Sequence, residues 1–496
     1  MKQPSIIFVI TLLFSFSGAI FSHANAQGFG QPLTIQGLDH FTANSAASKG
    51  MGGVTFGMQN DASLMFVDPA ALQSIQNLQV EVGGFQQNAG SHQDQHYSPL
   101  KYHSNFSLLM EGLTGSIGTP SYADTTKKYD AGDTVQRPYD KIGPNWSRKK
   151  TENPQLEAFA AVPFSIDGMK ITAGIGTIEY ADLSWFFQNN NVLSPSILSV
   201  KQSTITLPAT DGDSVAIPVK WYQSSQSREG SIRGYGAAFS VALSEKLSVG
   251  MNGMILNGHS DDSETRVERG RLIIYHDYFR ADSIYYRMAS SGTSDYTGAE
   301  FMLSGRYKGR YLELGFSVKP PTTITRKFNS TTRTDSTGFS RTATQTGQDK
   351  IEIPWRETIG LSIALRENLT LAAGLDIRSY GSAKYTAADG KESYPWLSAN
   401  VYHLGAEFRP IPSLAIRAGV REQAEVYQPV GNPLEGQPVS TTVYSFGVGI
   451  RVEEARLNLA YEYADMKYAD TWEDAVSFNG EIRRGVVADL SYDIPW

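Results

Sequence analysis

Residues 442–464 read TVYSFGVGIRVEEARLNLAYEYA. On either side of the central Glu-Glu pair, apolar side chains occupy every second position, and the positions between them are small or polar. Because successive side chains of a β-strand point to opposite faces, this pattern predicts two strands joined by a tight turn, each with one apolar face. The second face is rich in glycine, which a tightly packed soluble core would not favour.

The same alternation recurs from residue 78 to the end of the chain, and it predicts fourteen strands. Most of them are near the 9–11 residues that a tilted membrane-spanning strand requires. The predicted strands cover residues 78–87, 154–164, 170–180, 230–242, 246–257, 299–307, 311–319, 355–365, 368–380, 399–409, 413–422, 442–451, 456–464 and 484–494.

The connections between these strands alternate between short and long. Short turns are expected at Ser165–Met169, Ser244–Glu245, Lys308–Arg310, Arg366–Glu367, Pro410–Pro412 and Glu453–Ala455. Long loops are expected at about 88–153, 181–229, 258–298, 320–354, 381–398, 423–441 and 465–483. This order is typical of a transmembrane antiparallel β-barrel of the outer-membrane type, whereas a soluble sandwich with Greek-key crossings would not keep it. A fifteenth strand at Tyr102–Met110 would break the order, so we assign that stretch to the first long loop.

Energetics orient the faces of the strands. A Lys or Arg on the lipid face costs about 2–4 kcal/mol at mid-bilayer, so the apolar faces should meet lipid and the polar faces the lumen. The lumen should therefore receive Glu313, Asp376, Arg378, Glu407, Arg417 and Glu462. Aromatic residues near strand ends form girdles at membrane interfaces, and the candidates here are Tyr180, Tyr380, Tyr461, Tyr463 and Trp472.

The two ends of the chain carry export and assembly signals. Lys2, an apolar run over 6–14 and Ala24-Asn25-Ala26 predict a signal peptide over residues 1–26, cleaved after Ala26. The alternative is a membrane anchor, but the apolar run falls short of the roughly 20 residues that a spanning helix needs. The last strand ends at Trp496, which resembles the signal that barrel-assembly machinery recognises; an ordinary edge strand is the alternative.

Composition excludes some classes of function. The 496 residues include no cysteine and carry a net charge of −7 without basic clusters, which argues against a nucleic-acid partner. No nucleotide-binding, zinc-protease or nucleophile-elbow motif occurs, so we predict a protein that is not an enzyme and has no cofactor. His92, His96 and His103 share the first long loop, and acidic residues occur at Asp211, Asp213, Asp261, Asp262 and Glu264. Metal or calcium sites are possible interpretations, but solvated loop residues fit these scattered positions better, and we predict no metal site.

Three consecutive aromatic residues, Trp185, Phe186 and Phe187, follow the third predicted strand. They could form an entry surface for an apolar ligand. The alternative, which we favour, is interfacial girdle and loop packing.

Residues 45–72 form a Gly-punctuated segment that is neither a clean strand nor a clean helix. It resembles the opening of the long-chain fatty acid transporter (FadL/TodX) family of outer-membrane proteins, with its Gly-rich stretch, its Asn-Asp pair and its Asn-Pro-Ala triplet. The matching positions are Gly50, Gly52, Gly53, Asn60, Asp61, Ala62, Asp68, Pro69, Ala70 and Leu72. Further similar stretches occur in order at 314–321, 353–361, 404–410 and 416–419.

The resemblance implies a fourteen-stranded barrel in the bacterial outer membrane, with residues 27–77 as an N-terminal extension and lumenal hatch and 78–496 as the barrel. It implies passive uptake of hydrophobic compounds such as fatty acids, which are captured outside, passed inward when the hatch rearranges and released sideways through a gap in the wall. We expect a monomer whose other partners are outer-membrane lipids.

This chain has Asp68 where the family triplet has Asn, so a buried hatch would need a partner for its charge. Arg306, Arg378 or Arg417 could supply it from the lumen. Two other functions stay open: a barrel of the same superfamily that binds proteins for secretion or surface attachment, and a soluble secreted β-protein or adhesin. No contiguous motif specifies the substrate.

Overall fold

The computed structural model describes residues 33–41, 45–96, 145–151, 154–189, 214–218, 222–268, 271–275, 279–282, 286–336, 338–427, 439–472 and 475–495. The predicted signal peptide, the stretch Tyr102–Met110 and the terminal Trp496 lie outside these residues.

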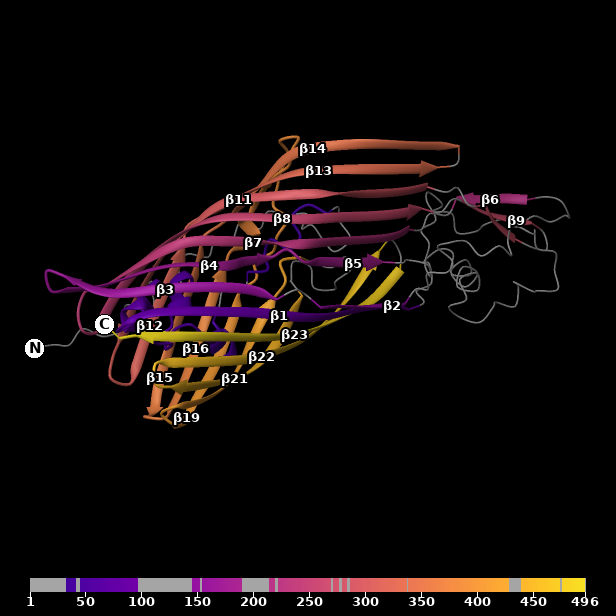
Figure 1. Cartoon of the computed structure of the whole chain (residues 1–496). Coiled ribbons are helices and arrows are strands. Elements are labelled where there is room, and N and C mark those ends of the chain that lie inside the picture. Colours follow the sequence, from indigo (N-terminus) through magenta and orange to yellow (C-terminus); the bar gives the residue numbers. More distant parts are fainter. Residues whose placement is uncertain are drawn as a thin grey trace, which may run out of the picture.

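The chain forms a closed antiparallel barrel of fourteen strands, as the alternating pattern predicts (Figure 1). The barrel closes where β1 (Leu78–His96) pairs with β23 (Ala475–Ile494), from Leu78 opposite Ile494 to His96 opposite Val476. Between them, in order, lie β3 (Gln155–Ile166), β4 (Met169–Asp182), β7 (Tyr222–Ala242), β8 (Leu247–Glu268), β11 (Tyr286–Lys308), β12 (Leu312–Lys319), β15 (Arg356–Arg366), β16 (Leu369–Arg378), β19 (Val401–Ile411), β20 (Leu414–Ala424), β21 (Ser440–Val452) and β22 (Ala455–Trp472).

Four of these wall strands continue as separate ladders. β2 (Trp146–Thr151) extends β3, and β5 (Trp185–Asn189) extends β4. β13 (Thr322–Ser336) continues β12 beyond Pro320-Pro321, and β14 (Phe339–Ile353) precedes β15 across Pro354. Proline has no backbone N–H to donate to a sheet, which explains the interruptions at Pro320-Pro321 and Pro354.

The remaining elements are short. β6 (Ser214–Pro218), β9 (Arg271–Tyr275) and β10 (Phe279–Asp282) form a separate small sheet. β17 (Lys384–Thr386) and β18 (Glu392–Ser393) lie beside β14, after the 3-10 turn η3 (Tyr380–Ser382). The helical elements at the start of the described chain are α2 (Ala46–Gly50), η1 (Ala62–Phe66) and η2 (Pro69–Ser74). No helix in the described part of the chain is long and apolar enough to cross a membrane.

The six predicted short turns are present, all at one end of the barrel. The predicted long loops are partly wrong, because several wall strands run on well past the predicted limits. β8 and β11, for example, pair continuously from Leu247 opposite Tyr307 to Glu268 opposite Tyr286. These extensions are rich in Ser and Thr on both faces, so they favour a strand while lacking the apolar alternation on which the prediction depended.

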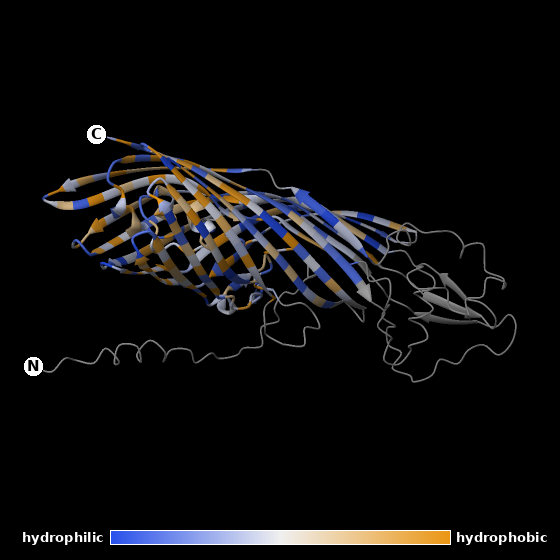
Figure 2. Ribbon diagram, turned by 90° about the horizontal axis from the view of Figure 1, so that it is seen from below, coloured by the Kyte–Doolittle hydropathy of each residue, from blue (hydrophilic) through white to orange (hydrophobic). Residues whose placement is uncertain are grey.

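The faces point as predicted. Figure 2 shows apolar and polar residues alternating along the strands of the barrel wall. Along β8, Val249, Met251 and Ile255 are exposed on the outside, while Glu313, Arg417 and Glu462 are buried in the lumen. Tyr461 is exposed, as a girdle residue would be.

Two other girdle predictions are wrong. Tyr180 and Tyr380 are 2% and 0% exposed and lie inside the barrel. In the β4–β7 ladder, the register shifts between Glu179 and Ala181, and this bulge turns Tyr180 inward. Tyr380 belongs to η3 and packs its ring against Trp396, with the ring centroids 5.4 Å apart.

Residues 45–77, which we call the hatch, lie in the lumen against the walls formed by β7, β8 and β20–β23. Wall glycines permit this contact. A β-carbon on Gly315 or Gly360 would come within 2.0–2.3 Å of the Phe56 ring, and one on Gly419 within 2.1 Å of the Gly52 nitrogen. The backbone of the hatch therefore touches the wall where the wall has no side chain.

Because the hatch fills the lumen at this level, deleting residues 45–72 should leave an open pore. We expect cells producing the deletion variant to become more sensitive to large antibiotics that the intact outer membrane excludes. Sensitivity measured against cells producing equal amounts of the full-length barrel checks this. Unchanged permeability with a correctly folded deletion variant would show that the hatch is not the plug.

Candidate functional site

The predicted hatch residues come together in the lumen. Asp61 caps η1 by accepting from the Ser63 nitrogen at 3.0 Å, and Pro69 begins η2. Asn60 adopts a positive φ of 55° and donates to Asp493 on β23 at 3.1 Å. Ala70 donates its N–H to the Ser304 hydroxyl at 2.8 Å.

The three predicted hatch glycines lie where the chain meets β19–β21. Gly52 and Gly53 have φ angles of +72° and +84°, which other residues rarely adopt. A β-carbon on Gly50 would lie 3.0 Å from the Gly447 Cα, and one on Gly52 would lie 2.7 Å from the Leu404 carbonyl oxygen. Larger residues at these positions would push the hatch away from the wall.

Asp68 has the partner that its burial requires. Its side chain is 0% exposed, and Arg306 Nη2 lies 3.0 Å from its Oδ2. The same guanidinium pairs with Glu313 at 2.9 Å and donates to the carbonyl oxygens of Thr55 and Met58. Burial nonetheless raises the pKa of Asp68 above its ordinary value, although Arg306 acts against this effect. Asp68 makes no side-chain cap on η2.

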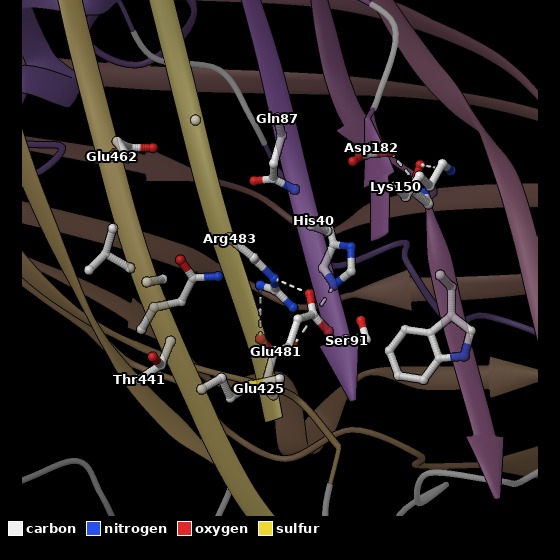
Figure 3. Close-up of a pocket in the computed structure, with 18 of the residues that line it drawn as sticks. His40, Gln87, Ser91, Lys150, Asp182, Glu425, Thr441, Glu462, Glu481 and Arg483 are labelled. Atoms are coloured by element: carbon white, nitrogen blue, oxygen red, sulfur yellow. Dashed lines mark hydrogen bonds and ion pairs between the residues drawn. The ribbon is translucent and has the colours of Figure 1, made fainter. Parts of the chain in front are cut away.

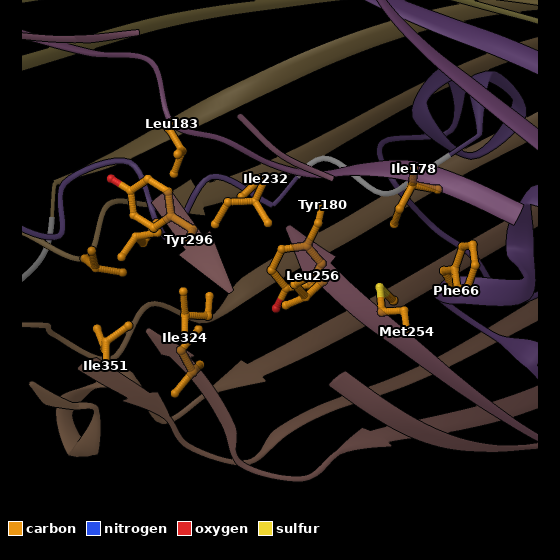
Figure 4. Close-up of a cluster of buried hydrophobic side chains, with 14 of the residues drawn as sticks. Phe66, Ile178, Tyr180, Leu183, Ile232, Met254, Leu256, Tyr296, Ile324 and Ile351 are labelled. Carbon is orange, nitrogen blue, oxygen red and sulfur yellow. The ribbon is translucent and has the colours of Figure 1, made fainter. Parts of the chain in front are cut away.

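The upper lumen holds a large apolar cluster (Figure 4). Its wall contributions include Ile232, Leu256 and Tyr296 from neighbouring strands. Residues 33–41, which we call the N-terminal segment, fill part of this space with Ile35 and Leu38, each 1% exposed. The apolar compartment therefore contains a piece of the chain itself.

Arg228 anchors the N-terminal segment. This side chain is fully buried on β7 and makes a bidentate ion pair with Asp262 at 2.7 and 2.9 Å. Its Nη1 also donates to the carbonyl oxygens of Thr34 and Gln36, at 3.1 and 2.8 Å. Glu264 accepts from the Leu33 nitrogen at 3.3 Å.

The barrel wall has a seam between its second and third strands. The β3–β4 ladder starts at Ile166 opposite Met169 and ends at Ala158 opposite Thr177. Beyond that point β3 and β2 stay paired with β1, and β4 and β5 stay paired with β7. No backbone ladder among the described residues joins the two sides above Thr177.

The N-terminal segment pairs with the free edge of β4 at this seam. Phe41 forms an antiparallel bridge with Ala181, and the Asp182 nitrogen donates to the His40 carbonyl oxygen at 3.0 Å. The bulge at Tyr180 accompanies this arrangement, and the Tyr180 hydroxyl donates to Glu300 at 2.6 Å inside the barrel. His40 and Phe41 thus cover part of the edge that β3 leaves unpaired.

Side chains close the seam outside the N-terminal segment. The rings of Trp146 on β2 and Phe186 on β5 lie with their centroids 5.4 Å apart. The guanidinium carbon of Arg148, also on β2, lies 4.0 Å from the Phe186 ring centroid. Lys150 donates to Ser184 at 3.4 Å. The Trp185-Phe186-Phe187 run is therefore a strand at the seam and not the loop that the sequence suggested, with Trp185 and Phe187 facing inward and buried.

A pocket lies on the lumenal side of the seam (Figure 3). Charged and polar side chains make up most of its lining, Lys49, Glu462 and Arg483 among them, and Phe85 and Met466 add apolar surface. His40 projects into it between two acidic neighbours, Asp39 and Glu425. Burial opposes a charge on His40, but these carboxylates outweigh it and raise the pKa of the imidazole to about 9.

The other predicted polar residues do not assemble into a site. His92 lies on β1, and the side chain of His96, together with His103, Asp211 and Asp213, falls outside the described residues. Asp261 is exposed on the outer face of β8, while Asp262 and Glu264 face the lumen. These last two acids hold the N-terminal segment and do not form a calcium site with Asp261.

Sequence reasoning missed the N-terminal segment and its anchor. Residues 33–41 have no periodicity, and Arg228 was assigned to a loop although it lies on β7. The pairing of Arg228 with Asp262 joins residues that are adjacent only through the β7–β8 ladder. Only a prediction that β7 begins as early as Tyr222 would have placed Arg228 opposite Asp262.

Comparison with solved structures identifies the fold. The chain is similar to the P. putida toluene transporter TodX, at 13% identity over 92% of this chain and 99% of that chain, with a TM-score of 0.59. A Pseudomonas aeruginosa FadL homologue matches at 13% identity over 94% and 99%, with a TM-score of 0.57. The CymD monoaromatic hydrocarbon channel matches at 12% over 93% and 99%, with a TM-score of 0.52.

The chain has the FadL/TodX fold. No family model matches its sequence, and neither does any curated protein. The identities are low, so the likeness concerns the fold alone.

The Asp68→Asn variant tests how the hatch tolerates a buried charge. An acid whose pKa is raised by folding stabilises the fold below its ordinary pKa, and this contribution is lost as the pH rises through the raised value. At pH 7, Asn should therefore leave the barrel as stable as Asp does, or more so, and the difference should vanish toward pH 4. The temperature at which the folded band is lost on a gel measures this.

The Arg306→Ala variant is the matched contrast. It removes the partner of both Asp68 and Glu313, and loss of one member of a buried ion pair costs about 3–5 kcal/mol. Its unfolding temperature should therefore fall well below that of the wild type, and its hatch should leak. Equal destabilisation by Asp68→Asn would contradict this account of the pair.

The Arg228→Ala variant should release the N-terminal segment. The lost charged hydrogen bonds are worth roughly 1.5–3 kcal/mol each, so cleavage by chymotrypsin after Leu33, Leu38 or Phe41 should accelerate about tenfold or more. Arg333→Ala, at an exposed ion pair on β13, is the control and should not change the rate. Equal cleavage of both variants would show that Arg228 does not hold the segment.

Proposed function

We propose that this chain is an outer-membrane channel for the passive uptake of hydrophobic compounds, with long-chain fatty acids and small aromatic hydrocarbons as the candidate substrates. Solved structures with the same fold include a toluene transporter and a monoaromatic hydrocarbon channel. The seam beside β4, occupied by the N-terminal segment, is the observation on which the proposal depends.

The seam offers an apolar molecule a route that avoids the hatch. Its lower end lies at lipid level, because Leu156 and Ile175 beside it are 70% and 66% exposed on the outer face. A molecule that leaves sideways here enters the membrane without crossing the polar contacts below, where the lumen is filled.

The N-terminal segment acts as the gate in this proposal. It fills the apolar compartment and covers the free edge of β4, so a ligand of similar size must displace it. Aromatic residues at the seam, including Trp185 and Phe186, form the rim over which the ligand passes. Ligand pockets are mostly apolar with few polar groups, and the compartment of Figure 4 has this character once the segment moves.

We further propose that the protein is not an enzyme and uses no energy source. Several charged groups of the described lumen pair with one another or with hatch carbonyls, as Arg306 does. Ion pairs of this kind hold structure together and leave no activated nucleophile beside a base. Movement of the substrate then follows its concentration gradient.

A single thiol at the seam tests the route. The chain has no cysteine, so Ser184→Cys introduces its only thiol, at a half-buried position of the pocket. A bulky reagent that attaches through a disulfide should reduce uptake of labelled oleate and toluene to the level of cells lacking the protein. Reduction of the disulfide should restore uptake, because the obstruction leaves.

Ser340→Cys, at an exposed position on β14, is the matched control and should accept the reagent without loss of uptake. Full uptake by quantitatively labelled Ser184→Cys would exclude the lateral route. If uptake of both compounds never depended on the protein, and deletion of its gene instead stranded cargo proteins in the periplasm, the secretion function would replace this proposal.

A further inference from the structure

Three neighbouring side chains, two of which line the pocket, have the chemistry of metal ligands. Asp39 and His40 belong to the N-terminal segment, and Glu425 is the first residue after β20. One ligand atom from each lies within 4.8 Å of the other two. His40 Nε2 is 4.0 Å from Asp39 Oδ2 and 3.9 Å from Glu425 Oε2.

Asp39 and Glu425 are buried and His40 is half-buried, and two atoms of the cluster have no hydrogen-bond partner in the described part of the chain. Asp39 is 8% exposed and Glu425 2%. The unpartnered atoms are Asp39 Oδ1 and His40 Nε2. Leaving a buried polar atom without a partner costs free energy, and Asp39 Oδ1 and the Nε2 of a neutral His40 imidazole each have a lone pair that can bind a cation.

The net charge around the cluster also favours a bound cation. Arg483 pairs with Glu425 Oε1 at 3.2 Å and with Glu481 at 2.5 Å. With His40 neutral, these three carboxylates and one guanidinium leave two negative charges, which a divalent cation would balance. A proton on His40 would balance only one of them. Arg483 occupies the other oxygen of Glu425 and so orients Oε2 toward the imidazole, as outer partners of metal ligands do.

We propose that Asp39, His40 and Glu425 bind a divalent transition-metal ion of the zinc class. One imidazole nitrogen with two carboxylate oxygens suits such an ion, whereas calcium and magnesium prefer oxygen ligands alone. Zinc bond lengths require the ligand atoms to approach to about 3.4 Å, so each carboxylate must move by about half an ångström. Water from the pocket completes the coordination.

The ion would join two distant parts of the chain. Two ligands come from the N-terminal segment at the seam and the third from the far wall, at the end of β20. Bound metal therefore fixes the segment inside the lumen. This inference does not depend on what the channel carries.

Zinc titration of untagged protein tests the site. Protein in detergent is first stripped with a chelator and then titrated calorimetrically with zinc chloride at pH 8. We expect one ion per chain, and at least tenfold weaker binding to His40→Gln and to Glu425→Gln. His259→Gln is the matched control, because His259 also lies beside two acids, Asp295 and Asp261, but is 57% exposed on the outer wall. Its zinc binding should equal that of the wild type.

A second measurement requires no variant to fold. Zinc should slow modification of His40 by diethylpyrocarbonate in the wild type and should slow chymotrypsin cleavage of residues 33–41. Failure of the wild type to bind zinc, undiminished binding by His40→Gln, or unchanged modification of His40 would each overturn the proposal. Loss of binding in His259→Gln would place the ion on the outer wall and overturn it as well.

Discussion

The closeness of the hatch backbone to the barrel wall is the constraint on which the rest of the structure depends. The Phe56 ring lies flat against Gly315 and Gly360, and Gly50 against Gly447, at distances where a β-carbon could not fit. Glycine usually weakens a strand, but at these positions its missing side chain lets the hatch pack directly on the barrel wall. One face of each strand must suit lipid, and the other must therefore be small enough to admit the hatch.

Burial of an irregular segment has a polar consequence. Backbone groups in the hatch that lack regular partners need donors and acceptors from the wall. Arg306 gives two hydrogen bonds to hatch carbonyls while balancing Asp68 and Glu313, and Asp489 accepts from the Ala46 nitrogen at 2.9 Å. These lumenal charges therefore supply hydrogen-bond partners to the backbone of the hatch, and the ion pairs between them help to hold the hatch in place.

The sequence predicts the barrel well because lipid imposes a strict period of two on one face. Fourteen strands, six short turns and the outward position of Ile255 follow from that rule, and Arg306 was one of three partners expected for Asp68. The strand extensions did not follow, because water on both faces imposes no alternation. The inward turn of Tyr180 depends on a one-residue bulge, which no local pattern in the sequence records.

That bulge connects the wall to the N-terminal segment. The ladder of β4 with β3 ends at Thr177, and the one-residue shift in the β4–β7 ladder follows between Glu179 and Ala181, where it changes the direction of β4. An unpaired strand edge inside a membrane protein must find another partner, because backbone groups cannot remain without hydrogen bonds in lipid. Phe41 supplies that partner at Ala181, so the segment that fills the apolar compartment is also the one that completes the wall.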